Sequence, residues 1–241
     1  MRWSMGILCL VFSCGYAADA LAQDTPLAIV QKGIEAQGGK AALAKAAIVK
    51  RTSKGKSFIG AEQEFTDTFQ LALPERMKFT LNLGKENFSM CLDGDKGWAL
   101  IGGFPNDLPK DKVDEMKGEA YFLHVVSLTP LLDSKAVLTS GQEGKVGTKP
   151  AAVVKARLGA GTEVTLHFDK ETGLLLRAER KATQSGVEVL KAVDYLNYQA
   201  FGAARMATKE THYLGPNRLA EIQDIRYEFQ ERVDPAVFKK P

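Results

Sequence analysis

Apolar and polar residues alternate through most of the stretch EQEFTDTFQLALPERMKFTLNLGKENFSMCLDGDKGWALI, which runs from Glu62 to Ile101. Side chains on a β-strand point alternately to opposite faces, so this period of two predicts strands with one apolar and one wet face. The pattern restarts after Pro74-Glu75 and again at Phe88. The apolar side consists of Phe65, Phe69, Leu71, Leu73, Met77, Phe79, Leu81, Leu83, Phe88, Met90 and Leu92. We therefore expect antiparallel strands that share one large apolar face.

The third of these segments is predicted to end in a turn. Asp93-Gly94-Asp95-Lys96-Gly97 is rich in residues that tolerate a positive φ, and the strand pattern resumes at Trp98. Two interpretations of Trp98 remain open at this point. Its ring packs on neighbouring strands, or it forms the wall of a pocket, since a large amphipathic ring suits a site that is half filled by ligand.

The N-terminus has the layout of a secretory signal peptide. A cationic start at Met1-Arg2 precedes a short apolar run, and Ala20-Leu21-Ala22 is an A-x-A site, which predicts a signal over residues 1–22 with cleavage after Ala22. A lipid anchor on Cys14 is a less favoured alternative, because Phe12 matches a bacterial lipobox poorly. Residues 23–241 are then predicted to form one exported domain.

The charge and the cysteine count of the chain argue against a nucleic-acid partner and against disulfide bonds. The net charge is +3 and no basic tract is present, which argues against nucleic acid as a partner. Cys9 and Cys14 lie in the expected signal, so Cys91 remains alone and no intrachain disulfide is expected. The exported chain must therefore be held together by its apolar core.

Helices are predicted at the start and in the middle of the chain. Thr25-Pro26 is a good helix start, and Gly38-Gly39 supplies a left-handed ending. Gly102-Gly103, followed by two prolines, is expected to break the sheet pattern. A helix is then predicted over 110–126, where Val113, Met116, Ala120 and Leu123 recur at helical spacing. An amphipathic helix between runs of strands usually covers a sheet face.

The remaining segments are read mainly as strands. Ile48 to Phe58 is expected to be a first or edge strand, because its four basic residues would resist further strand pairing. Later strands run from Ala136 to Phe229, and they include the alternating Leu166 and Phe168. The prediction is a mainly β (α+β) domain of about ten or eleven strands, with a terminal helical turn over 233–238.

Enzymatic or metal-binding constellations are not apparent in the sequence. His124, His167 and His212 are far apart, and no nucleophile elbow or dinucleotide-binding glycine loop is present. Cys91 is a weak candidate nucleophile, because its parity places it on the face opposite Phe88. We expect no catalytic residues, no metal and no cofactor, so the chain is predicted not to be an enzyme.

A cavity is expected because the predicted sheet is large and the helices that cover it are few and short. Many long strands with large side chains are covered by only about three short helices, and a curved sheet covered so sparingly leaves an interior volume. The candidate cavity residues are Phe65, Phe69, Met77, Phe79, Phe88, Met90, Trp98, Met116, Leu123, Leu166 and Phe168.

Several short motifs, spread in order over residues 23–241, resemble one known family. They are Gln37-Gly38-Gly39 with Ala42-Leu43, Pro74-Glu75-Arg76-Met77-Lys78, Asp93-Gly94 with Gly97-Trp98, Phe168-Asp169-Lys170-Glu171-Thr172-Gly173-Leu174, and Val233-Asp234-Pro235-Ala236-Val237-Phe238. In this order they are similar to the LolA/LolB-like superfamily of bacterial envelope lipoprotein carriers, especially its outer membrane lipoprotein-sorting branch.

The resemblance implies an incomplete antiparallel β-barrel of about eleven strands, with helices covering its concave apolar face. Proteins of this kind bind acyl chains of lipoproteins or other lipids in the periplasm. Arg76 follows the proline where the family often has a basic residue, which implies that it helps to hold a helical lid. The implied partners are lipoprotein acyl chains or lipid, and inner- and outer-membrane transfer proteins, with the carrier itself a monomer.

Two functions follow from these expectations. The first is a periplasmic carrier that binds acyl chains under a lid formed by residues 110–132, where methionine and phenylalanine repack around varied chains. The alternative is an envelope sensor or protein-interaction module of the same fold, which has a filled interior and transports no lipid.

Overall fold

The computed structural model describes residues 24–184 and 186–241. The predicted signal peptide and the Cys14 alternative lie outside the described residues. The helices are α1 (Pro26–Ala36), α2 (Lys40–Ala44), the 3₁₀ turn η1 (Lys45–Ala47), α3 (Lys110–Val126), and the 3₁₀ turns η2 (Thr129–Leu132) and η3 (Pro235–Phe238). The middle helix thus has the predicted bounds.

The strands form one sheet, described here along the chain. Its first six strands are β1 (Ile48–Ser57), β2 (Gln63–Ala72), β3 (Arg76–Leu83), β4 (Glu86–Asp93), β5 (Lys96–Ile101) and β6 (Phe104–Asp107). The other eight are β7 (Ala136–Ser140), β8 (Gly144–Val146), β9 (Lys149–Leu158), β10 (Val164–Asp169), β11 (Leu175–Gln184), β12 (Val187–Phe201), β13 (Ala204–Leu214) and β14 (Asn217–Phe229).

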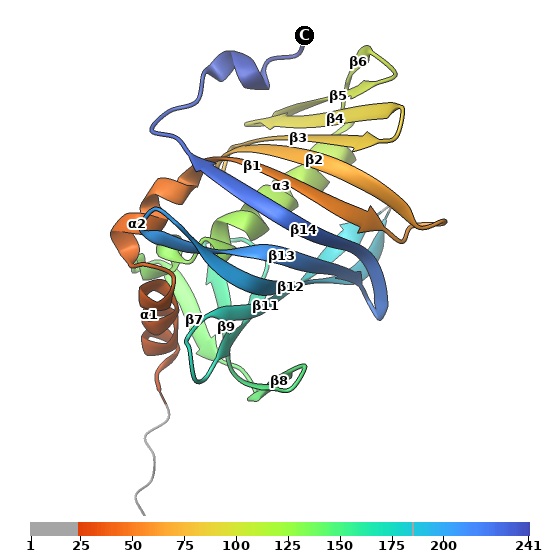
Figure 1. Ribbon diagram of the computed structural model, residues 1–241. Coiled ribbons are helices and arrows are strands. Elements are labelled where there is room, and N and C mark those ends of the chain that lie inside the picture. Colours follow the sequence, from red (N-terminus) through yellow and green to blue (C-terminus); the bar gives the residue numbers. More distant parts are fainter. Residues whose placement is uncertain (1–23, 185) are drawn as a thin grey trace, which may run out of the picture.

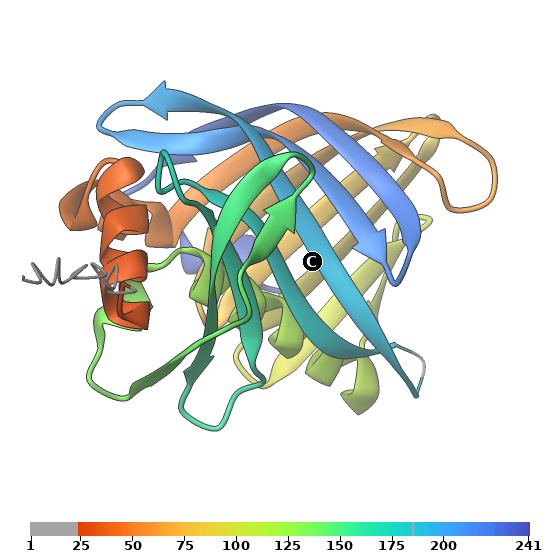
Figure 2. The ribbon, with the colours of Figure 1, turned by 90° about the horizontal axis from the view of Figure 1, so that it is seen from below.

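The order of strands in the sheet follows the chain order except at β8 and at the pairing of β1 with β14, which we call the seam. It runs β6-β5-β4-β3-β2-β1-β14-β13-β12-β11-β10-β9-β7, all antiparallel, while β8 pairs with β9 beside this path. The sheet curves strongly but does not close, because β6 and β7 are its two free ends (Figures 1 and 2). The predicted incomplete antiparallel barrel is confirmed, although the described residues form 14 strands rather than about eleven.

The prediction of an edge strand near residue 50 is wrong. Strand β1 lies in the middle of the sheet, paired with β14 on one side and β2 on the other. Its lysines do not prevent this, because Lys50 and Lys54 point to the exposed convex face while Arg51 is buried on the concave face. Period-two patterning identified the strand but not its neighbours.

The expected break at Gly102-Gly103 is also wrong, because the sheet continues beyond it. Both glycines have positive φ, and they form a tight turn that leads into β6. Pro105 lies in β6 opposite Leu100. A proline is tolerated there because β6 is the edge of the sheet, where a missing N–H removes little pairing.

The first helix begins and ends as its sequence predicts. The hydroxyl of Thr25 accepts a hydrogen bond from the backbone N–H of Ala28 at 3.2 Å, and Pro26 occupies the first turn. Gly38 has a φ of 107°, and a Cβ there would lie 2.0 Å from the carbonyl oxygen of Ala203. Only glycine fits this corner, which fixes α1 against the start of β13.

Candidate functional site

Helix α3 crosses the concave side of the sheet. It connects the two free ends, since it follows β6 and leads through η2 to β7. Figures 1 and 2 show it inside the curve of the strands. It packs on β4 and β5 at one side and on β9, β10 and β11 at the other. Its buried side chains are Val113, Met116, Ala120, Phe122 and Val125.

Two neighbouring cavities remain between α3 and the sheet. The inner cavity, of about 130 Å³, lies toward α1 and α2 and is lined by residues that include Leu43, Leu71 and Leu123. The outer cavity, of about 360 Å³, is lined by residues that include Met77 and Phe79. Shared lining side chains make them adjacent: Phe69, Glu119, Phe122, Val193 and His212. Only the outer cavity reaches the usual size of a ligand pocket, about 300–1,000 Å³.

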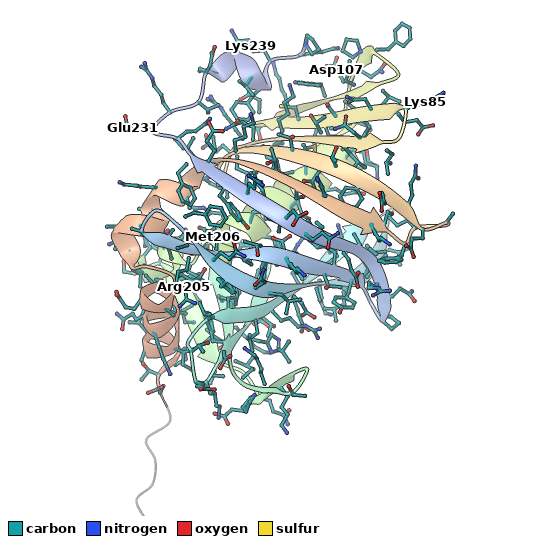
Figure 3. The ribbon with its side chains drawn as sticks, in the orientation of Figure 1. Lys85, Asp107, Arg205, Met206, Glu231 and Lys239 are labelled. Carbon is teal, nitrogen blue, oxygen red and sulfur yellow. The ribbon has the colours of Figure 1, made fainter. Side chains whose placement is uncertain are left out.

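The inner cavity ends near the corner between α1 and α2. Met206, labelled in Figure 3, lies near the start of β13 and lines this end. Lys85, in the turn between β3 and β4, lies far from it at the opposite end of the sheet in the same figure. Methionine adapts its shape to different neighbours, so the inner end of the cavity has an adaptable wall.

The structure gathers six of the eleven candidate cavity residues around these cavities. They are Phe69, which lines both cavities, Leu123 in the inner one, and Met77, Phe79, Met90 and Met116 in the outer one. Phe88 lies next to this group, with its ring centroid 6.2 Å from that of Phe79. Sequence alternation on strands and periodicity on α3 thus converge on the same interior.

Three other candidates are on the concave side but are packed into the core. Leu166 and Phe168 are at most 1% exposed and lie in a cluster with α1, where a Cβ on Gly33 would lie 2.6 Å from the Phe168 ring. Phe65 belongs to a separate cluster with Ile222 and Ile225. These residues stabilise the walls rather than line the two cavities.

Trp98 lies on the convex face, so the interpretation as a pocket wall is wrong. Its Nε1 donates a hydrogen bond to the carbonyl oxygen of Phe238 at 2.8 Å, and it packs with Cys91 under the C-terminal turn η3. Trp98 pairs with Cys91 across β4 and β5, and paired residues share a face. Burial raises the pKa of the Cys91 thiol to about 12, so it is protonated at neutral pH.

Arg76 does not hold α3, contrary to the role implied by resemblance. It shares the strand parity of Lys78, on the convex face, and its Nε is 2.8 Å from Asp93 in the adjoining strand. Arg180 of β11 is one residue that attaches the helix, and the Tyr121 hydroxyl of α3 also accepts a hydrogen bond from the Leu158 N–H of β9 at 2.9 Å. Arg180 Nη2 donates to Glu119 of α3 at 2.7 Å, and its guanidinium lies 5.4 Å from the centre of the Phe122 ring. No pattern in the sequence indicated this pairing.

A buried polar cluster faces the inner cavity and was missed by sequence reasoning. We define it as Arg51, Glu210 and His212. Arg51 Nη2 donates to Glu210 at 3.0 Å, and His212 Nε2 lies 2.9 Å from the same oxygen. A signal was available nearby, because Asp67 has the apolar parity of β2, where it is buried and bonded to Ser53.

The charges of this cluster stabilise each other. Burial opposes ionisation of Arg51, but Glu210, with smaller contributions from Tyr227, Asp67 and Tyr195, outweighs it and holds the Arg51 pKa above its ordinary value. Burial likewise acts to raise the pKa of Glu210, but Arg51 and His212 outweigh it, and the pKa is lowered. Both groups are therefore charged at neutral pH and form a compensated pair inside an apolar interior.

Within residues 24–184 and 186–241, no three His, Cys, Asp or Glu side chains gather as metal ligands would. Across the same part of the chain, no helix combines the length and the apolar character needed to cross a membrane. His124, His167 and His212 are each partly buried and lie on α3, β10 and β13 respectively.

Comparisons with known proteins identify the fold. No protein-family model matches the chain, and no curated protein matches its sequence. A LolA superfamily protein from Nitrosomonas europaea has a similar structure, with a TM-score of 0.57 and 10% identity over 90% of this chain and 99% of that one.

Two further solved structures have a TM-score of 0.52. One is a domain named for outer membrane lipoprotein sorting, from Vibrio parahaemolyticus, at 13% identity over 87% of this chain and 97% of that one. The other is a DUF1329 family protein from Desulfovibrio piger, at 9% identity over 90% and 98%. The open barrel of the LolA superfamily, which the motifs implied, is thus the fold of this chain.

Proposed function

We propose that this protein binds the acyl chains of lipoproteins or other lipids between α3 and the concave sheet face, and carries them through the periplasm. The observation that supports this most directly is the pair of adjacent, largely apolar cavities beneath α3. The structural similarity to a domain named for lipoprotein sorting is in accord with it. Periplasmic location rests on the signal peptide expected from the sequence.

Binding energy is ample for such cargo. Burial of an acyl chain yields about 0.8 kcal/mol per methylene, so a chain of about 14 methylenes offers up to roughly 11 kcal/mol. The cavities lie between α3 and the sheet, so we propose that α3 and η2 act as a lid that moves outward to admit cargo. The work of moving the lid offsets part of the burial energy, which permits release.

The contacts of α3 suit a lid. Lys117 pairs with Asp95 in the β4–β5 turn, where both side chains are solvent-exposed, and such pairs contribute little. Glu119 is the stronger attachment, since its partner Arg180 is buried. The apolar side chains of α3 exchange one apolar environment for another when a lipid replaces the sheet.

Native mass spectrometry of the exported protein tests the proposal directly. A co-purifying acylated species near one-to-one ratio, identified after denaturing extraction, is the expected result. A mass that corresponds to the bare chain, unchanged by added lipid, would contradict carriage and would favour the interaction module with a filled interior.

Charged substitutions locate the binding region. Phe79→Asp and Met116→Asp are each expected to abolish uptake of an apolar dye and of lipid, because a carboxylate in the outer cavity must be desolvated when cargo binds. Thr80→Asp is the matched control, since Thr80 follows Phe79 on β3 and points to the opposite face. If both cavity variants fold and still bind lipid, the cargo lies elsewhere.

A further inference from the structure

Arg51 retains an unused hydrogen-bond donor in the interior. The residue is 7% exposed and lines the inner cavity. Its Nη2 donates to Glu210, yet no acceptor in the described part of the chain meets its buried Nε. A buried donor without a partner costs free energy comparable to a lost hydrogen bond, so such a group calls for an explanation.

Arg51 lies at the wall of a cavity that a ligand could fill. Its guanidinium lies 5.2 Å from the centre of the Phe69 ring, which lines both cavities. The walls nearby are mostly apolar and include Val49 and Leu71. A ligand that fills the cavity with hydrocarbon alone would leave the Nε–H unpaired, whereas a ligand with an oxygen at this depth would satisfy it.

The charge balance selects the kind of oxygen. Glu210 already compensates the charge of Arg51 and lies within the same cluster. A carboxylate ligand would bring a second negative charge beside Glu210, which disfavours it. A neutral carbonyl accepts the hydrogen bond without this repulsion.

We infer that Arg51 anchors the carbonyl oxygen of an esterified or amidated acyl chain in the inner cavity. This deepens the proposed function and rests on it, because it names the ligand class as acyl esters or amides rather than hydrocarbons or free fatty acids. The acyl chain then extends from the carbonyl through the cavities beneath α3.

Three probes of equal chain length test the anchor by displacement of an apolar dye from the wild-type protein. They are methyl dodecanoate, which has a neutral carbonyl, dodecanoate, which is charged, and dodecane, which has no acceptor. We expect the ester to bind roughly tenfold more tightly than either of the others. Equal binding of all three would overturn the anchor while leaving the carrier function intact. Displacement by none of them, with no lipid in the extract, would overturn both.

Paired substitutions assign the preference to Arg51. Arg51→Met with Glu210→Gln removes both charges of the pair, and it should abolish the ester preference while dodecane still binds. Arg177→Met with Asp194→Asn is the matched control, because it removes another arginine–carboxylate pair whose two residues line neither cavity. A preference that survives the first pair, or is lost only with the second, would overturn the assignment.

An infrared measurement on the wild type needs no variant to fold. The carbonyl stretch of ¹³C-labelled methyl dodecanoate should move to lower wavenumber in the protein than in hexane, because the Nε–H bond weakens the C=O bond. A bound ester with the hexane frequency would overturn the anchor.

Discussion

The two halves of the sheet bury their apolar faces to different degrees. In the half formed by β7–β14, here the packed half, Val154, Val164 and Leu166 are fully buried beneath α1, η2 and the second part of α3. In the half formed by β1–β6, here the open half, β3 has one buried residue, Met77, while Phe79 and Leu81 stay partly exposed. The first part of α3 is the main helical cover of this half.

The two halves of the sheet therefore differ in role: one stabilises the fold and the other leaves apolar surface for a ligand. The packed half has the contacts of an ordinary core and holds the shape of the molecule. The open half has apolar side chains whose burial is incomplete, so part of the available hydrophobic free energy is not used in folding. A lipid that covers this half would gain that energy, which is the physical basis of the proposed binding.

Phe168→Ala should have the largest effect on folding. Removal of this fully buried ring from the packed half is expected to lower the free energy of unfolding by about 3–5 kcal/mol. Urea denaturation followed by circular dichroism measures it. A loss below about 1 kcal/mol would mean that the packed half is no better packed than the open half.

Arg51→Met tests the boundary between the halves, since β1 belongs to the open half and Glu210 to the packed half. The single substitution leaves the Glu210 charge buried and should cost about 3 kcal/mol of unfolding free energy. Addition of Glu210→Gln should recover most of that loss in the same denaturation assay. Failure to recover would show that the ion pair itself, rather than the stranded charge, stabilises the boundary.

Phe79→Ala should reduce lipid affinity more than stability, whereas Phe168→Ala should mainly reduce stability. Phe79 is half-buried in the open half, so its loss should cost only about 1 kcal/mol of stability. The dissociation constant for lipid, measured by dye displacement, should rise by about tenfold, because the ring lines the outer cavity. A large stability loss without change in affinity would remove the distinction between the halves.

A smaller effect concerns acid stability of the packed half. Burial acts to raise the pKa of Asp169, but Lys149 and the backbone N–H groups of Glu171 and Thr172 outweigh it and lower the pKa. Its contribution is therefore present above the unfolded pKa, about 3.9, and is lost as pH falls through the folded pKa. Asp169→Asn should lose less stability than wild type between pH 5 and about pH 2, as measured by urea denaturation at each pH.

Local patterns predicted the elements well. The period of two between Glu62 and Ile101 gave β2–β5, and helical spacing gave α3 from Lys110 to Val126. These signals report which face of an element is apolar. Six of the candidate cavity residues therefore lie at the cavities.

Such patterns could not predict contacts between residues that lie far apart in the sequence. The partner of Arg51 is 159 residues away, and alternation within a strand carries no information on its neighbours. The same reason explains the position of β1 in the sheet and the attachment of α3 by Arg180. The face of the sheet on which Trp98 lies was ambiguous, because it depends on the register between β4 and β5. The geometry of the connecting turn sets that register, which pairs Trp98 with Cys91.

The seam between β1 and β14 has a consequence for the order of folding. Strands β1–β6 can pair in sequence as hairpins, but β1 gains its second neighbour only when β14 arrives, near the end of the chain. Contacts so distant along the chain form slowly. A chain that stops before Asn217 would leave β1 and β13 as two long unpaired edges, which are templates for aggregation. The last strand thus decides whether a nearly complete chain becomes a soluble protein or a self-associating one.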